Sequence, residues 1–189
     1  MESLSEKWEK FSLSEHEGNQ YLVQEDEIEE GYYLAAHFFT SRVLSMEAIT
    51  RTFKLLWRTR KGFEVRDLGN HKVLFKLSDP SDVDRILKGE PWSFDKYLVA
   101  LKRVSKHTNM RSLVFDKTSF WVQVHNLPVG SFSMAVAKDI ASIVGMVDES
   151  ETEVGDGEGY SFLRVQIAVN PSIPLCRGKK IARRDGSVS

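Results

Sequence analysis

Apolar and polar positions recur along residues 34–103 with the spacing of alternating strands and helices. Strands are predicted at 34–39, 63–68, 71–77 and 97–103. A helix is predicted after Ser45, a suitable N-cap, because apolar residues follow it at three- and four-residue spacing. A second, shorter helix follows Asp79 and Pro80, and we expect Gly89 to end it in the left-handed conformation.

This order, β-α-β-β-α-β, predicts an α+β fold of the ferredoxin-like class, with two helices on one face of a four-stranded antiparallel sheet. The other face of the sheet is then expected to be free. We expect Val73, Phe75 and Leu77 to point together toward the helices, because alternate residues of a strand share a face. The same phase places on the free face the side chains of His37, Phe39, Lys72, Leu74 and Lys76.

A second, smaller unit follows a polar segment at 105–118, which we interpret as a linker. Its predicted elements are a strand at 120–124, a helix at 133–144 and a strand at 163–167. We expect this β-α-β unit, residues 119–178, to pack on the domain at 32–104. Acidic residues among glycines at 148–159 predict a solvated loop.

Charge is unevenly distributed, although the formal net charge of the 189 residues is only -1. Ten of the 27 acidic residues but only two of the 26 basic residues lie in 1–31, so the rest of the chain has an excess of seven positive charges. We expect the acidic leader at 1–31 to be partly disordered and the basic tail at 179–189 to be disordered.

The absence of several motifs narrows the expected function. Cys176 is the only cysteine, so neither an intrachain disulfide nor a thiolate cluster for a metal is expected. We expect no cofactor, secretory leader, membrane span or small-molecule substrate, and we predict an intracellular protein of the nucleus or cytoplasm. There is no glycine-rich phosphate loop, and the chain offers no nucleophile with a base, so we do not expect an enzyme.

Basic residues are dense between 51 and 76, which is typical of a surface that binds phosphates and equally of an ordinary solvated surface. Tryptophans 57, 92 and 121 lie beside apolar residues, so we interpret them as core residues. His125 lies just after a predicted strand, where it could contact a base or simply cap the turn before Pro128.

Three segments carry a resemblance to a known family: PWSFD at 91–95, FWVQVHNLP at 120–128, and FLRV at 162–165 followed by PLCRG at 174–178. In their order and separation, from about Phe11 to Gly178, they resemble the plant domain of unknown function 4283. The resemblance implies a layout like that of RNA-recognition motifs. Relatives often precede a CCHC zinc knuckle in proteins derived from LINE-type retrotransposons, so it also implies nucleic-acid binding.

The sequence departs from that pattern in two respects. It has no CCHC cluster, so zinc is not expected. RNA-recognition motifs stack bases on aromatic residues of their central strands, whereas Gln123 occupies one of these places and lysines occupy others. We therefore expect binding to depend on charge more than on stacking.

The predicted function is non-enzymatic binding of nucleic acid, with RNA preferred over DNA and single-stranded RNA as the expected target. The alternative is a protein-interaction or assembly module whose sheet face docks another chain or a second copy. Candidate binding residues are His37, Phe39, Arg58, Arg60, Lys61, Lys72, Lys76, Gln123, His125, Arg164, Lys179, Lys180, Arg183 and Arg184.

Overall fold

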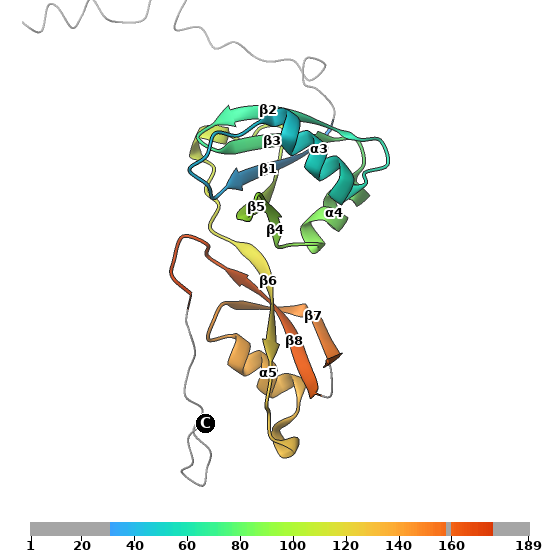
Figure 1. Cartoon of the computed structure of the whole chain (residues 1–189), viewed down its shortest axis with the longest axis vertical. Coiled ribbons are helices and arrows are strands. Elements are labelled where there is room, and N and C mark those ends of the chain that lie inside the picture. Colours follow the sequence, from blue (N-terminus) through green and yellow to red (C-terminus); the bar gives the residue numbers. More distant parts are fainter. Residues whose placement is uncertain (1–30, 158–159, 176–189) are drawn as a thin grey trace, which may run out of the picture. The chain divides into compact units, whose positions relative to one another are not determined.

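The structure, a computed structural model, describes residues 31–157 and 160–175. These residues form a five-stranded and a three-stranded sheet, both antiparallel, and three α-helices (Figure 1). The predicted α+β class is confirmed. The predicted acidic leader and the basic tail lie outside the described residues, apart from Gly31.

The first sheet has the strand order β2-β3-β1-β5-β4. Its strands are β1 (Tyr32–Phe38), β2 (Phe63–Gly69), β3 (Lys72–Leu77), β4 (Trp92–Phe94) and β5 (Tyr97–Val104). Strand β1 is central and pairs with β3 on one side and β5 on the other. The sequence did not predict β4, because three residues are too few to display an alternating pattern.

Helices α3 (Met46–Trp57) and α4 (Pro80–Lys88) cover one face of this sheet. Ser45 caps α3 by accepting a hydrogen bond from the backbone N–H of Ala48 at 3.2 Å, as predicted. The core beneath the helices is rich in aromatic rings. Trp57 is fully buried there, and its ring centroid lies 4.7 Å from that of Phe75 on β3.

The prediction for Gly89 was wrong, because its φ of -80° is not left-handed. Its backbone N–H closes the helix by bonding to the carbonyl oxygen of Arg85. Glycine is needed here for space. A Cβ at this position would lie 2.8 Å from Cζ2 of Trp92, which packs against the end of the helix.

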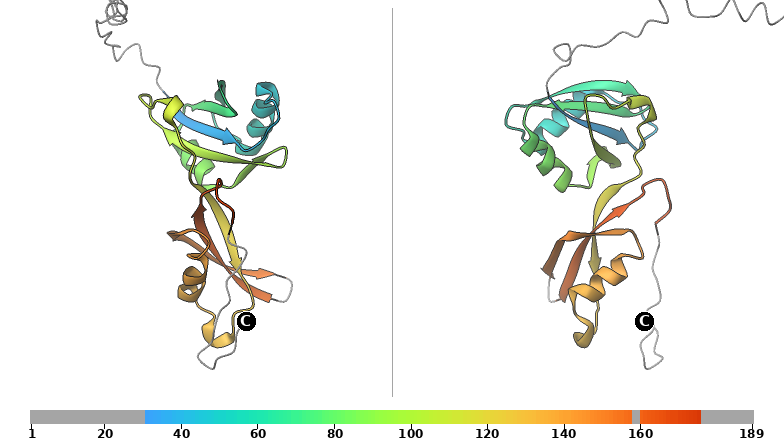
Figure 2. Two further views of the ribbon diagram at one scale, coloured as in Figure 1. Left: turned by 90° about the vertical axis from the view of Figure 1, so that its left-hand side faces the viewer. Right: turned by 180° about the vertical axis from the view of Figure 1, so that it is seen from behind.

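The second face of the sheet was predicted to be free, and that prediction was also wrong. Residues 110–116, the covering segment, lie over it, beginning with a short 3-10 helix at Met110–Ser112. Phe115 is buried against Ala35 and Ala100. In the left view of Figure 2 the yellow turn of this segment lies beside the blue strand β1. Burial of the small apolar side chains of this face favours the covered arrangement.

The second sheet has the strand order β6-β8-β7, with strands β6 (Thr118–Val124), β7 (Met146–Gly157) and β8 (Tyr160–Val169). Helix α5 (Met134–Ala141) covers one face. The acidic segment predicted as a loop over 148–159 is instead largely part of β7. Its backbone pairs with β8 from Thr152 onward, and an edge strand tolerates a charged sequence.

Candidate nucleic-acid interface

Two of the predicted binding residues on the first sheet contact the covering segment. The ring of His37 stacks on that of Phe115, with centroids 5.6 Å apart and planes at 28°. The Nζ of Lys72 donates to the carbonyl oxygen of Leu113 at 2.9 Å and lies 5.9 Å from the centre of the Phe115 ring. Phe39 meets His37 edge to face and packs against the same cluster. In this structure the chain itself occupies the face predicted to bind bases.

Burial under this segment also affects the charge of His37. Desolvation lowers the pKa of the imidazole below its ordinary value, and the nearby positive charges of Lys72 and His71 lower it further. The neutral ring is therefore favoured, which suits stacking on Phe115 rather than binding of phosphate.

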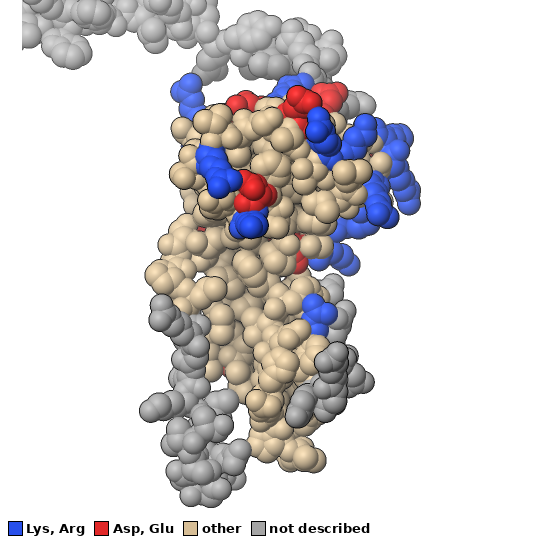
Figure 3. Space-filling model, viewed as in Figure 1, with Lys and Arg blue, Asp and Glu red and all other residues tan. Residues whose placement is uncertain are grey.

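Basic side chains gather instead where α3 and α4 lie, as the blue surface in Figure 3 shows. The cationic edge consists of six exposed residues: Lys54, Arg58, Arg60, Lys61, Arg85 and Lys88. They come from the end of α3, the loop after it, and α4. The structure thus brings three predicted residues, Arg58, Arg60 and Lys61, to one loop.

A hollow of about 310 Å³ lies beside this loop. Three lysines line it, Lys54, Lys61 and Lys76, together with Thr50, Ser78 and the acidic Glu64. Lys76 therefore borders the hollow, whereas the sequence placed it on a free sheet face. Ammonium groups and hydroxyls are groups that bind phosphate oxygens.

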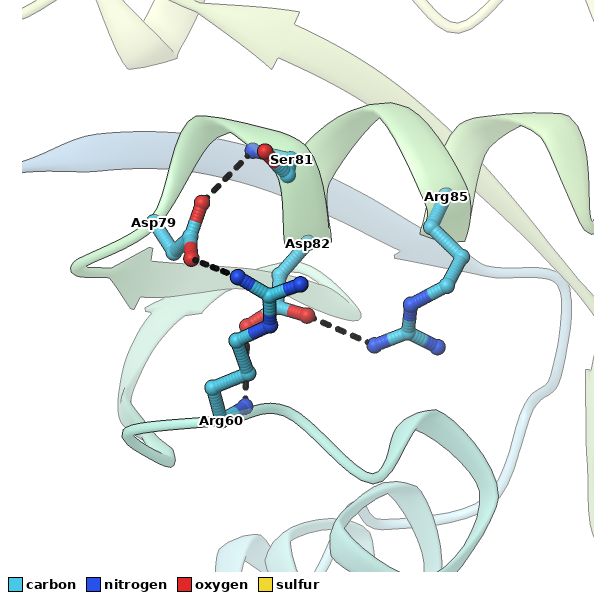
Figure 4. Close-up of polar contacts among 5 residues, drawn as sticks. All are labelled: Arg60, Asp79, Ser81, Asp82 and Arg85. Atoms are coloured by element: carbon cyan, nitrogen blue, oxygen red, sulfur yellow. Dashed lines mark hydrogen bonds and ion pairs between the residues drawn. The ribbon is translucent and has the colours of Figure 1, made fainter.

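Asp82 fixes the position of the loop that carries Arg60 and Lys61, as Figure 4 shows for Arg60. This carboxylate is only 4% exposed and accepts hydrogen bonds from the backbone N–H of Arg60 at 3.0 Å and from Nη2 of Arg85 at 2.7 Å. The Arg60 guanidinium also lies 3.6 Å from Asp79, which caps α4 through the N–H of Ser81. Part of the charge of the cationic edge is thus neutralised by carboxylates.

The protonation of Asp82 follows from these contacts. Burial alone would raise its pKa, but the hydrogen bonds from Arg85 and Arg60 and their positive charges outweigh burial and lower it below the ordinary value. The loop is therefore held by an ionised carboxylate at neutral pH.

The remaining predicted residues meet on the second sheet. Gln123 on β6 is the register partner of Arg164 on β8, so both lie on one face. The Arg164 guanidinium lies 4.9 Å from the centre of the Trp121 ring. On the same face Nε2 of His125 lies 3.0 Å from Oε1 of Gln123.

Phe162 completes this group, with its ring centroid 5.1 Å from that of His125. The stacking face thus consists of Trp121, Gln123, His125, Phe162 and Arg164. Gln123 and His125 are exposed, and the other three are half-buried. Such a face combines aromatic rings and a guanidinium plane, on which bases stack, with polar groups that can bond base edges.

Two members of this face, Trp121 and Phe162, were not among the binding residues predicted from the sequence. Trp121 was predicted to be a core residue, but the hydrophobic core of this unit contains its neighbours Phe120 and Val122 instead. The alternation of β6 was a signal that could have placed Trp121 with Gln123 rather than with the core. Trp57 and Trp92 pack in the core as predicted.

Metal-ligand clusters and membrane-spanning helices are absent from the described residues. There is no group of three or more potential metal ligands among them, and none of their helices is long and apolar enough to cross a membrane. The predicted residues Lys179, Lys180, Arg183 and Arg184 lie outside the described part of the chain.

The first sheet with its two helices and the start of the covering segment has a counterpart among known families. Residues 29–111 match Domain of unknown function (DUF4283). The DUF4283 match confirms the predicted family for this span, which is less than half of the chain and does not include the second sheet. No curated protein matches the sequence.

Proposed function

We propose that this protein binds single-stranded nucleic acid, RNA in preference to DNA, and is not an enzyme. The observation that carries the proposal is the stacking face, where Trp121 and Arg164 lie beside the exposed Gln123 and His125 on one side of a sheet. Aromatic and guanidinium planes hold bases of any sequence by stacking, and the two polar side chains can select among base edges.

The cationic edge supplies the second part of the proposal. Its lysines around the 310 Å³ hollow are suited to the phosphates of a flexible strand, which makes affinity depend on salt. The strand order β2-β3-β1-β5, with α3 and α4 on one face, supports an RNA-recognition-like layout for this unit. A relation to plant retrotransposon proteins belongs to the same proposal and rests on the sequence resemblance.

The test is fluorescence anisotropy with a labelled mixed-sequence RNA of about 20 nucleotides at roughly 50 and 200 mM salt. We expect binding that weakens steeply at the higher salt. The double variant Gln123→Ala, His125→Ala should lower affinity at least about tenfold at both salts, because it removes contacts to bases. The double variant Lys54→Ala, Lys61→Ala should instead make the slope of log affinity against log salt concentration shallower by about one to two.

Lys106→Ala is the matched control, because Lys106 is exposed but belongs to neither the stacking face nor the cationic edge. Binding by this variant should equal that of the unaltered chain. Absence of binding at the lower salt contradicts the proposed function. Binding that the Gln123, His125 variant leaves unchanged contradicts the assignment to the stacking face.

A further inference from the structure

Strand β6 lies at an edge of the second sheet and differs from the other edge strands. In the part of the chain that the structure describes, β6 pairs only with β8. Unpaired backbone groups at a sheet edge bind other strands, and proteins usually prevent this with charge, proline, a bulge or a short strand.

The other three edges of the described sheets carry such devices. Strand β2 contains Glu64, Arg66 and Asp67 and has a register shift after Asp67, while β4 is three residues long. Strand β7 has an acidic sequence and its own register shift. Strand β6, with the sequence TSFWVQV, has seven residues, no charge, no proline and no register shift.

The backbone groups that point outward from β6 can be identified. The N–H of Ser119 donates to Oε2 of the buried Glu90 at 3.0 Å, so it points away from β8. Along an antiparallel strand, residues alternate between facing one neighbour and the other. The groups of Trp121 and Gln123 therefore point to the same outer edge as those of Ser119.

A hollow of about 410 Å³, lined mostly by apolar residues, lies alongside this edge, between β6 and α5. Its apolar lining comprises Val122, Val124, Leu127, Pro128, Val136, Ile140 and Val144. The connection that borders the hollow also projects apolar side chains, since Val129 is 97% exposed and Phe132 is 38% exposed. One small region thus carries both an apolar recess and apolar projections.

We propose that β6 pairs antiparallel with β6 of a second copy of this chain. The pairing uses the outward backbone groups of Trp121 and Gln123, since the N–H of Ser119 already donates to Glu90. The uncharged strand meets itself without charge repulsion, and the hollow and the exposed Val129 lie next to the edge that pairs, where a second copy can bury them. Antiparallel pairing keeps the helix-covered faces on one side, so the two stacking faces join into one six-stranded surface. The pairing itself does not depend on nucleic-acid binding.

The decisive variant is Gln123→Pro, compared with Gln123→Ala. Proline removes an N–H that points outward, and it leaves the hydrogen bonds between β6 and β8 intact, as proline on an edge strand does. Sedimentation equilibrium of the full chain without nucleic acid, between about 1 and 100 µM, should show a rise from monomer toward dimer. Gln123→Pro should weaken the dimer at least about tenfold, and Gln123→Ala should not.

Val129→Asp is a second variant, chosen because a side chain that is 97% exposed is not needed for folding. It should also weaken the dimer, and circular dichroism should show an unchanged fold. A chain that stays monomeric at about 100 µM overturns the proposal, as does a dimer that neither Gln123→Pro nor Val129→Asp weakens. Because no RNA is present, either outcome leaves the proposed function to be judged by its own assay.

Discussion

Replacement of Phe115 by alanine tests whether the covering segment is part of the folded unit. Phe115 is 7% exposed, and its ring stacks on His37 and lies near the ammonium group of Lys72. Burial of a phenylalanine side chain contributes about 1.5 to 3 kcal/mol, and an aromatic pair adds about 0.5 to 1.5 kcal/mol. We therefore expect Phe115→Ala to lower the free energy of unfolding by about 2 to 4 kcal/mol.

The assay combines urea unfolding with an NMR titration of His37. Loss of Phe115 should rehydrate the imidazole, so its pKa should rise toward the ordinary value of about 6.5. In the unaltered chain the contribution of His37 to the free energy of unfolding is intact above a pH of about 6.5 and is lost as the pH falls through the lowered pKa. That loss should become smaller in the variant.

Val114→Ala is the matched control, because Val114 belongs to the same segment but is 62% exposed. It should change stability by less than about 0.5 kcal/mol. If Phe115→Ala leaves both the unfolding midpoint and the pKa of His37 unchanged, the segment does not cover the sheet as described.

Three further substitutions test individual contacts. Asp82→Asn should lower the free energy of unfolding by about 1.5 to 3 kcal/mol at neutral pH, because it weakens the hydrogen bond from the Arg60 N–H and removes the negative charge. Measured by unfolding at decreasing pH, this difference should vanish as the pH falls from about 4 through the lowered pKa of Asp82. Burial raises the pKa of Glu90, so its neutral form contributes stability that is intact below about 4.5 and is lost as pH rises from there through the raised value. Glu90→Gln should therefore become more stable than the unaltered chain as the pH rises above about 4.5 in the same assay. Gly89→Ala should lower the free energy of unfolding, measured by thermal unfolding, by about 1 to 3 kcal/mol, because the added Cβ clashes with the ring of Trp92.

The sequence was a good guide to elements whose pattern is local. The cap at Ser45, the apolar spacing of α3 and the alternation of β3 depend on residues within one element, and the structure has them as predicted. The assignment of Val73 to the helix-covered face was correct for the same reason.

Features that depend on distant partners could not be predicted in this way. Four of the seven residues of the covering segment are apolar, but they show no sustained periodicity. The reason for the burial of Phe115, the small side chains of Ala35 and Ala100, lies far away in the sequence. Strand β7 is acidic and is defined by its pairing with β8 rather than by its own composition. The stacking face likewise requires the register that places Gln123 opposite Arg164.

The covering segment also determines where a stable fragment of the first domain can end. A fragment that ends at Val104, after the last strand of the first sheet, would leave Ala35, Ala100 and Leu74 in contact with water. A fragment that continues past Phe115 keeps these three side chains buried. The practical boundary of the first domain therefore lies about a dozen residues beyond its sheet, and proteolysis within residues 110–116 should yield a product prone to aggregate.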